Sequence, residues 1–213
     1  RNGHDNPKPI IPGERFTLCL QLKSVAYRFR KGHRIRLVIS TNYWPMVWPS
    51  PERETVTLFT GSAKLELPTT DGLELMTPDN LFEQPEGAPE LPVRIDSAET
   101  TAMNINYDVI ARETDLTYQT DDGVTYYPDI DLSTQRTAVN HYIIRDDDPS
   151  SAQVTMYRTF KIFRENWSAS TVEQLQLTCD NDTFQVCGKL DAYDTDDSIF
   201  SREWNETIPR IFK

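Results

Sequence analysis

Three histidines and one serine in a turn come closest to what nucleophilic catalysis needs. A serine hydrolase requires a Ser activated by a nearby His, and the Ser often lies in a G-x-S-x-G turn between a strand and a helix. That motif is absent from the sequence, and Gly61-Ser62 is the nearest approach to it. His4 lies in a Pro-rich segment, whereas His33 and His141 belong to alternating segments that predict strands. The sequence therefore predicts no catalytic triad and no catalytic residue.

Clusters of aspartate raise the question of a calcium site. An EF-hand loop needs Gly at its sixth position and Glu at its twelfth. The segments that begin at Asp180 and at Asp194 have neither residue at those positions. Short polar side chains of this kind are typical of hairpin tips, where they bond to their own backbone. We therefore expect no metal site, and no motif indicates a cofactor.

Aromatic residues are concentrated between Tyr43 and Pro51, a segment called the Trp-Pro loop below. It carries Tyr43, Trp44-Pro45 and Trp48-Pro49, which is more rigid apolar surface than a solvated loop requires. We predict that Tyr43, Trp44 and Trp48 form an interface or line the wall of a pocket. A sugar-stacking platform is the alternative use of such aromatic residues.

The segment before this loop predicts a basic hairpin from Ala26 to Ile39. Aromatic and aliphatic residues alternate with Arg and His, and Lys31-Gly32 provides the turn. Gly32, His33, Arg34 and Arg36 are interpreted as a structural motif, with the two arginines as ion-pair residues of the sheet.

The remaining alternation divides the chain into three parts. Short strands are predicted over 16–23, 55–60 and 64–67, after a turn at Pro12-Gly13, so 1–67 forms the first module. Residues 68–99 are rich in Pro and predict a connector, with one helical turn at 78–82. Residues 100–213 predict an antiparallel β module. Its strands are expected at 103–115, 124–132, 137–145, 152–164, 170–179, 183–193 and 199–204.

Aspartate-rich turns separate these later strands. Asp121-Asp122-Gly123, Asp146–Pro149, Asp180–Asp182 and Asp194–Asp197 are all predicted to be hairpin tips. No segment has a 3.6-residue period over three turns, so the fold class is all-β with little helix.

The composition and the net charge limit the classes of partner that the chain can have. The 213 residues are 38% hydrophobic, which suffices for a globular core, and the net charge of -11 argues against nucleic acid and anionic membranes as partners. Residues 1–60 hold ten Lys or Arg and four Asp or Glu, so a basic early segment precedes an acidic remainder. There is no apolar run long enough to span a membrane. The first residue, Arg1, suggests a piece of a longer polypeptide.

The three cysteines are not expected to pair. A tight turn between Cys179 and Cys187 would place Cys179 opposite Phe184, so the two cysteines would point to opposite faces. Cys19 lies far from both in sequence. Free thiols favour a reducing compartment, and we expect a cytoplasmic protein.

Several of these motifs together resemble a known family. Pro12-Gly13, the run AYRFRKGHRIRLVIS from Ala26, the WP and WPSP of the Trp-Pro loop and the L-x-L-P at Leu65 resemble the C-terminal domain of X-prolyl dipeptidyl peptidases and cocaine-esterase-like (CocE/NonD) serine hydrolases. The later segment is similar to the tail of some of these enzymes. The residues that carry this second similarity are Tyr142, Asp148-Pro149, Arg164, Trp167, Cys179-Asp180, Phe184, Leu190-Asp191-Ala192, Phe200, Arg202, Trp204 and Ile208-Pro209-Arg210.

The resemblance implies a fold and a role. It implies that residues 1–67 are the C-terminal portion of a jelly-roll, galactose-binding-like β-sandwich, and that the triad lies on an α/β-hydrolase part outside this chain. The chain would be a non-catalytic module that braces the catalytic part and shapes the substrate pocket. Its partner would be that catalytic part, or complementary strands from another chain or fragment.

Two other functions stay open. One is a carbohydrate-binding β-sandwich module. The other is a structural or assembly protein completed by a partner subunit, and a homo-oligomer is also possible.

Overall fold

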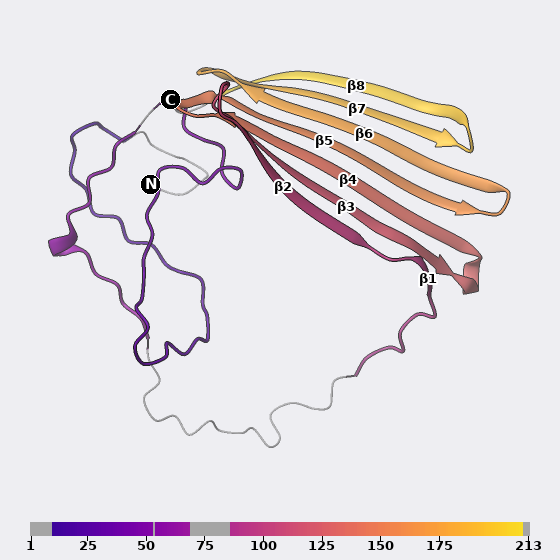
Figure 1. Ribbon diagram of the computed structural model, residues 1–213, viewed down its shortest axis with the longest axis horizontal. Helices are drawn as coiled ribbons and strands as arrows, with labels where there is room; N and C mark the ends of the chain where they lie inside the picture. The colour runs from indigo at the N-terminus through magenta and orange to yellow at the C-terminus, as the bar shows by residue number, and fades with distance from the viewer. Residues whose placement is uncertain (1–9, 53, 69–85, 211–213) are drawn as a thin grey trace.

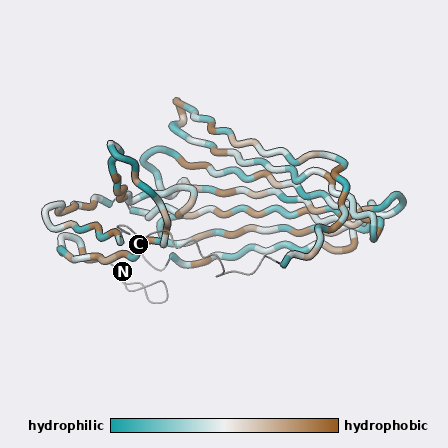
Figure 2. Tube along the Cα trace, turned by 90° about the horizontal axis from the view of Figure 1, so that it is seen from below, coloured by the Kyte–Doolittle hydropathy of each residue, from teal (hydrophilic) through white to brown (hydrophobic). Residues whose placement is uncertain are grey.

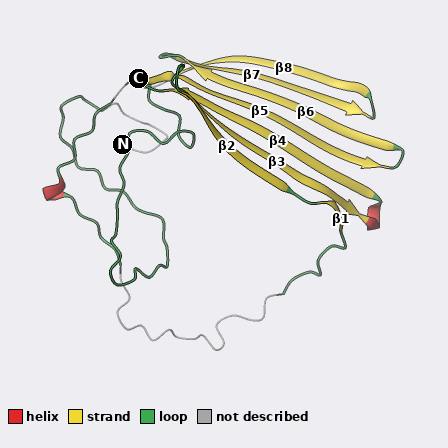
Figure 3. Cartoon of the chain, in the orientation of Figure 1, coloured by secondary structure: helices red, strands yellow, loops and turns green. Residues whose placement is uncertain are grey.

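The computed structural model describes residues 10–52, 54–68 and 86–210 of the chain. Its main body is a single antiparallel sheet of eight strands (Figure 1; Figure 3). Within the described residues the only helices are two 3-10 turns, η1 at Thr60–Ser62 and η2 at Pro128–Ile130. The predicted all-β class with little helix is therefore confirmed. The described helices include none that is long and apolar enough to cross a membrane.

Seven of the eight strands follow one another as neighbours in the sheet. The strands are β1 (Arg94–Ser97), β2 (Thr100–Asp108), β3 (Glu113–Tyr127), β4 (Leu132–Arg145), β5 (Asp148–Arg164), β6 (Trp167–Cys179), β7 (Thr183–Asp194) and β8 (Asp197–Pro209). From β2 to β8 each strand pairs with the next one in the chain, and β1 lies beside β3 on the same edge as β2. This arrangement is the predicted antiparallel meander.

Short polar turns connect the strands, as the sequence predicts for three of the tips. At the β6–β7 tip, the Asp180 carboxylate accepts hydrogen bonds from the backbone N–H of Asp182 at 2.7 Å and of Thr183 at 2.6 Å. Asp147 and Thr195 adopt left-handed conformations in the β4–β5 and β7–β8 tips, with φ of 62° and 56°. Asp and Asn tolerate this region better than most residues, which suits Asp147, whereas the β7–β8 tip places a threonine in it.

The fourth predicted tip, Asp121-Asp122-Gly123, is wrong. These residues form an irregularity inside β3, where the register shifts between Asp121 and Val124 while β4 continues alongside. Gly123 has φ of +71°, and a Cβ placed there would lie 2.2 Å from the carbonyl oxygen of Ser97 in β1. The glycine is therefore required by a bulge and a close strand approach, which leave the same sequence signal as a turn.

Two predicted strands are also wrong in their limits. The alternation over 103–115 spans the end of β2, a four-residue turn and the start of β3. Asp108 makes that turn by accepting hydrogen bonds from the N–H of Ile110 and Ala111. The predicted strand over 124–132 contains η2 and the β3–β4 turn, with Asp131 in the left-handed region at φ 48°. Both turns contain apolar residues, so the alternation of apolar and polar residues continues through them and does not mark where the strands end.

The register of the ladders separates the side chains into two faces of different character. Residues directly opposite one another share a face, and successive residues of a strand alternate between faces. One face, called the apolar face below, carries Met103, Ile105, Leu116, Tyr118, Tyr142, Val154, Met156, Phe160, Leu175, Leu177, Phe184, Val186, Leu190, Phe200 and Trp204. The other, the polar face, carries Asn104, Asp115, Thr117, Gln119, His141, Thr155, Gln174, Gln176, Gln185, Lys189, Glu203 and Asn205.

The most buried residues of the sheet lie on the two adjacent strands β4 and β5. Ala152 and Val154 of β5 are buried, at 1% and 6% exposed, together with Ser133 and Asn140 of the adjacent β4. Many apolar side chains elsewhere remain exposed, because a single layer buries a side chain only against its neighbours in the same sheet. Stable domains normally consist of two or more packed layers.

Residues 10–52 and 54–68 form turns, including the 3-10 turn η1, but no strands. The turn at Pro12-Gly13 is present, with the Glu14 N–H donating to the Ile11 carbonyl at 3.1 Å, and so is the turn at Lys31-Gly32. The strands predicted over 16–23, 26–39, 55–60 and 64–67 are not formed, and this part of the prediction is wrong. Alternation gives a segment one apolar face, but a strand also needs a neighbour that satisfies its backbone groups.

Figures 1 and 2 place this first region at one end of the sheet. It gathers beyond the end where the β2–β3, β4–β5 and β6–β7 tips lie, and the rest of the sheet extends away from it. Strand β1 lies inside the range 68–99 that was predicted as a connector, and the helical turn predicted at 78–82 lies outside the described residues.

Candidate functional site: the Trp-Pro loop on the sheet

Local hydrogen bonds shape the Trp-Pro loop. The Trp44 N–H donates to the side-chain oxygen of Asn42 at 3.1 Å, and the Val47 N–H donates to the Tyr43 carbonyl at 2.9 Å. The peptide bond between Trp44 and Pro45 is cis. These turns bring the two tryptophan rings into a T-shaped contact, with centroids 5.1 Å apart and planes at 86°.

The two rings lie on the end of the apolar face. Trp48 makes an edge contact with Phe184 of β7, with a centroid distance of 5.5 Å, and its indole N–H donates to the Cys179 Sγ at 3.2 Å. Trp44 makes a longer edge contact of 6.3 Å with Tyr142 of β4. Aromatic pairs in this geometry contribute about 0.5–1.5 kcal/mol beyond the area they bury. The loop is therefore attached to three strands that follow it far along the chain.

Arg210 joins the loop to the β6–β7 tip. Its guanidinium donates to the Pro49 carbonyl at 2.7 Å and to the Asp180 carbonyl at 2.9 Å, and it lies 4.9 Å from the centre of the Phe184 ring. The Arg210 backbone N–H also donates to the Asp182 carbonyl at 2.7 Å. Only an arginine offers several donors in one plane that also stacks on a ring, so a lysine could not replace it fully.

The electrostatics of this tip favour an ionised Asp180. Hydrogen bonds from the backbone N–H of Asp182 and of Thr183 hold the pKa of the Asp180 carboxyl below its ordinary value. The Thr183 hydroxyl and the positive charge of Arg210 act in the same direction. Asp180 is thus a structural carboxylate that fixes the tip on which the loop rests.

One side of the Trp-Pro loop remains open. Pro49 is buried and Trp44 and Trp48 are half-buried, whereas Tyr43 is 69% exposed and Met46 is 75% exposed. Of the three predicted interface residues, the two tryptophans therefore face the sheet of their own chain, and Tyr43 faces away from it.

The predicted structural motif lies apart from this site. The His33 N–H donates to the Arg30 carbonyl at 3.0 Å, and Gly32 has φ of +88° in that turn. His33, Arg34 and Arg36 are all exposed. The motif therefore occupies a turn of the first region, and no contact with the tryptophans brings it into the loop site.

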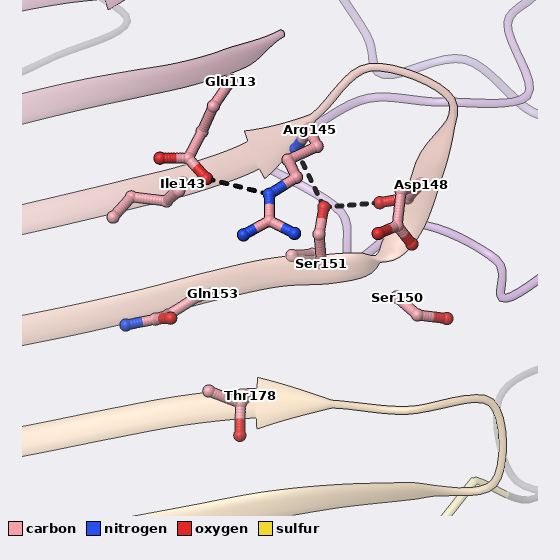
Figure 4. Close-up of a pocket in the computed structure, with 9 residues that line it drawn as sticks. Glu113, Ile143, Arg145, Asp148, Ser150, Ser151, Gln153 and Thr178 are labelled. Carbon is pink, nitrogen blue, oxygen red and sulfur yellow. Dashed lines mark hydrogen bonds and ion pairs between the residues drawn. The ribbon is translucent and has the colours of Figure 1, made fainter. Parts of the chain in front are cut away.

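A hollow that resembles a pocket lies near the β4–β5 tip (Figure 4). It measures about 380 Å³. Arg145 donates from its Nε to Glu113 at 3.1 Å and from its backbone N–H to the Ser151 Oγ at 2.8 Å. The Ser151 hydroxyl donates to the Asp148 carbonyl at 2.6 Å, so its proton is engaged in a hydrogen bond within the β4–β5 tip. The hollow contains no histidine that could activate this serine.

The one histidine of the sheet pairs with a carboxylate on the polar face. His141 Nδ1 lies 3.4 Å from Asp115 and 3.3 Å from the Thr117 hydroxyl. No hydrogen bond between His141 and a serine is found among the described residues, so this pair does not amount to a triad. A cluster of three metal-ligating side chains is also not found in that part of the chain.

The cysteines lie as the sequence predicts. Cys179 pairs with Phe184 across the β6–β7 ladder, and Cys187 lies on the opposite face. All three thiols are free.

Sequence reasoning assigned no role to the residues that hold the Trp-Pro loop. Tyr142 and Arg210 enter the sequence analysis only through the resemblance to the tail of certain hydrolases, and Cys179 and Phe184 enter it through that resemblance and the predicted β-turn between the cysteines. Their contacts with the loop span 98 residues or more of sequence, as between Trp44 and Tyr142. That separation leaves no periodic signal, although their joint occurrence with the loop motif is a signal that a comparison of whole sequences could use.

Comparisons with known proteins bear on the first part of the chain. No curated protein and no solved structure matches the chain. A family model matches residues 1–79, a range that contains the Trp-Pro loop. The sheet formed by β1–β8 lies beyond that range. The domain that this model describes is the X-Pro dipeptidyl-peptidase C-terminal non-catalytic domain, so residues 1–79 are similar to that domain.

Proposed function

We propose that this chain is the non-catalytic β module of a serine hydrolase of the X-Pro dipeptidyl-peptidase type, and that it braces the catalytic part and shapes one wall of its substrate pocket. A non-catalytic C-terminal domain implies a catalytic part that it serves. The described residues offer no nucleophile with an adjacent base, which is consistent with a supporting role.

One observation carries the bracing role. The Trp-Pro loop lies within the matched segment, and Trp48 and Pro49 are fixed to the sheet through Phe184, Cys179 and Arg210. The matched segment and the sheet are therefore joined at this loop. A module held in this way can transmit rigidity to whatever packs against it, because the loop is not free to move alone.

Tyr43 supports the second part of the proposal. Its ring is exposed beside two tryptophans whose own positions are fixed by the sheet. A preorganised aromatic side chain is a common element of a hydrophobic substrate pocket. Tyr43 would thus contact the catalytic part or the substrate, while Trp44 and Trp48 would hold it in place.

The test uses the complete gene product that carries this chain. Hydrolysis of an X-Pro dipeptide anilide and of a nitrophenyl ester is measured for the complete product and for residues 1–213 alone. We expect activity only in the complete product. A gene product without a serine hydrolase part, or with activity that persists in residues 1–213 alone, would overturn the proposal.

A matched pair of variants tests the role of the loop. Replacing Trp44 and Trp48 with Ala should lower the temperature at which the complete product loses activity, by an amount that corresponds to a few kcal/mol. Met46→Ala, in the same loop but 75% exposed, should leave that temperature nearly unchanged. Tyr43→Ala should raise KM and leave that temperature nearly unchanged. Equal thermal behaviour of all three variants would contradict a bracing role.

A further inference from the structure

The apolar face of the sheet is far larger than a monomer normally leaves open. Strands about 4.8 Å apart with a rise of about 3.3 Å per residue give the shared part of β2–β8 an area on the order of 1,000 Å². Exposed apolar patches on monomers usually reach only about 300–600 Å². Met103, Leu175 and Phe200, at three positions across this face, are 64%, 38% and 47% exposed.

The composition of this face is that of a protein interface. Interface cores are rich in aromatic residues, Met and Arg and poor in acidic residues and Lys. Every strand from β2 to β8 except β6 contributes an aromatic residue or Met to the apolar-face residues given above, and two of the arginines on this face lie over rings. Arg136 lies 5.7 Å from the centre of Phe160, and Arg202 lies 5.0 Å from the centre of Trp204. Its acidic residues include Glu173, which lies opposite Arg158, and Glu206, which lies opposite Val186.

The Trp-Pro loop shows which part of the protein approaches this face. Trp48 contacts Phe184 and Cys179, and Trp44 contacts Tyr142, all on the apolar face at one end of the sheet. The loop belongs to the segment that matches a non-catalytic peptidase domain. Figure 1 shows that residues 10–68 gather at that end and leave the remaining length of the sheet uncovered.

From these observations we infer that the apolar face of β2–β8 is the docking surface for the catalytic part, which lies against the sheet in continuity with the Trp-Pro loop. This inference rests on the proposed function. It assigns the docking surface to residues 100–209, outside the segment that the family match covers. The apolar face then becomes the inner face of a two-layer arrangement, and the polar face stays in solvent.

Two positions on β6 form a matched test of this surface. Leu175 lies on the apolar face opposite Met156, and Val172 lies on the polar face opposite Thr159. Their exposed fractions are similar, 38% and 41%. Leu175→Cys and Val172→Cys are therefore introduced separately into residues 1–213 and into the complete gene product. Maleimide labelling at each new cysteine is then followed by peptide mass spectrometry, which also separates it from the three native thiols.

The expected result is selective protection. In residues 1–213 alone, at micromolar or lower concentration, both cysteines should react at similar rates. In the complete product, Cys at position 175 should react at least tenfold more slowly, and Cys at position 172 should react at an unchanged rate. Leu175→Glu should in addition destabilise the complete product far more than Val172→Glu.

Each other outcome has a definite meaning. An active hydrolase in which both cysteines react equally fast would overturn the docking surface and leave the proposed function standing. A gene product without a hydrolase part would overturn both. If position 175 is protected in residues 1–213 alone, in a concentration-dependent way that Leu175→Glu abolishes, a second copy covers the face and the inference is wrong.

Discussion

Residues 10–68 and the sheet β2–β8 have the same kind of sequence pattern and different structures. Both contain segments in which apolar and polar residues alternate strictly, as in Phe16–Lys23 and in Met103–Asp108 of β2. In the sheet every such segment pairs with its neighbour in the chain. In the first region the turns form but the strands between them do not. The comparison teaches that alternation selects which face would be buried, and that a partner decides whether the strand exists.

Turn geometry accounts for part of the difference. Gly32 occupies the third position of the Arg30–His33 turn with φ of +88°, which is the pattern of a type II turn. Turns of that type splay the segments that they join, because their twist is opposite to that of a β-ladder. The sheet instead has register shifts next to its β4–β5 and β7–β8 tips, which let the strands keep their right-handed twist.

The largest effect should come from placing a charge at equivalent alternating positions of the two regions. Val154 in β5 is 6% exposed, whereas Ile35 in the first region is 52% exposed. Val154→Asp should lower the free energy of unfolding by about 3 kcal/mol or more, because a buried carboxyl lacks hydrogen-bond partners. Ile35→Asp should change it by less than about 0.5 kcal/mol. Urea unfolding followed by circular dichroism measures both, and similar losses would mean that the first region has a core of its own.

Two glycines with positive φ provide a second comparison. A Cβ at Gly123 would lie 2.2 Å from the Ser97 carbonyl oxygen, whereas a Cβ at Gly32 would have no atom within 4 Å. Gly123→Ala should therefore cost about 2–3 kcal/mol, from the left-handed backbone and the displacement of β1. Gly32→Ala should leave the unfolding midpoint of the sheet nearly unchanged, since its turn supports no ladder. An equal shift for both would show that the two regions unfold together.

A third prediction tests the contact between the two regions, which the Trp-Pro loop makes with the sheet. Removing either Trp48 or Arg210 should release the Trp-Pro loop and leave the sheet intact, at a cost of about 1–2 kcal/mol for the docked state. Hydrogen exchange at residues 43–50 should accelerate in Trp48→Ala and in Arg210→Ala, while exchange in β4 and β5 stays slow. Arg210→Lys should give an intermediate effect, because Lys keeps the charge and loses the planar set of donors. Unchanged exchange in the loop would contradict the attachment.

The smallest effect should appear on acidification. The folded-state pKa of Asp180 is lowered, so its contribution to the β6–β7 tip is complete above the ordinary Asp pKa and is lost as the pH falls through the lowered value. The amide signals of Asp182 and Thr183 should therefore shift with a midpoint below the ordinary Asp value in an NMR titration. Asp180→Asn should remove that titration. A midpoint at or above the ordinary value would mean that the tip does not hold the carboxylate.

The sequence predicts correctly those features of the fold that depend on residues close to one another in the chain. The all-β class, the meander, the face of each strand and the positions of Cys179 and Cys187 follow from a two-residue period and short turns. The errors occur where two different structures have the same sequence pattern. Gly123 marks a bulge where the sequence predicted a turn, and the alternation over 103–115 continues through a real turn.

The sequence predicts the loop of the candidate site but not the residues that the loop contacts. The concentration of Tyr43, Trp44 and Trp48 indicated a contact surface, and the family match at residues 1–79 bears on the segment that carries it. What the tryptophans touch could not be predicted, because six strands separate the loop from Phe184 in the chain and eight separate it from Arg210, so these contacts depend on how the whole sheet is assembled.

The sequence by itself determined which residues of this protein are apolar on one side and polar on the other, where its turns lie, and which segment resembles a peptidase domain. Those properties depend on side-chain period and on local backbone preferences, which neighbouring residues settle. Only the tertiary structure decided which alternating segments become strands, since each ladder needs a second strand to accept its hydrogen bonds. It also decided that the Trp-Pro loop lies on the end of an otherwise uncovered apolar face, because contacts between residues far apart in sequence depend on how the strands are assembled.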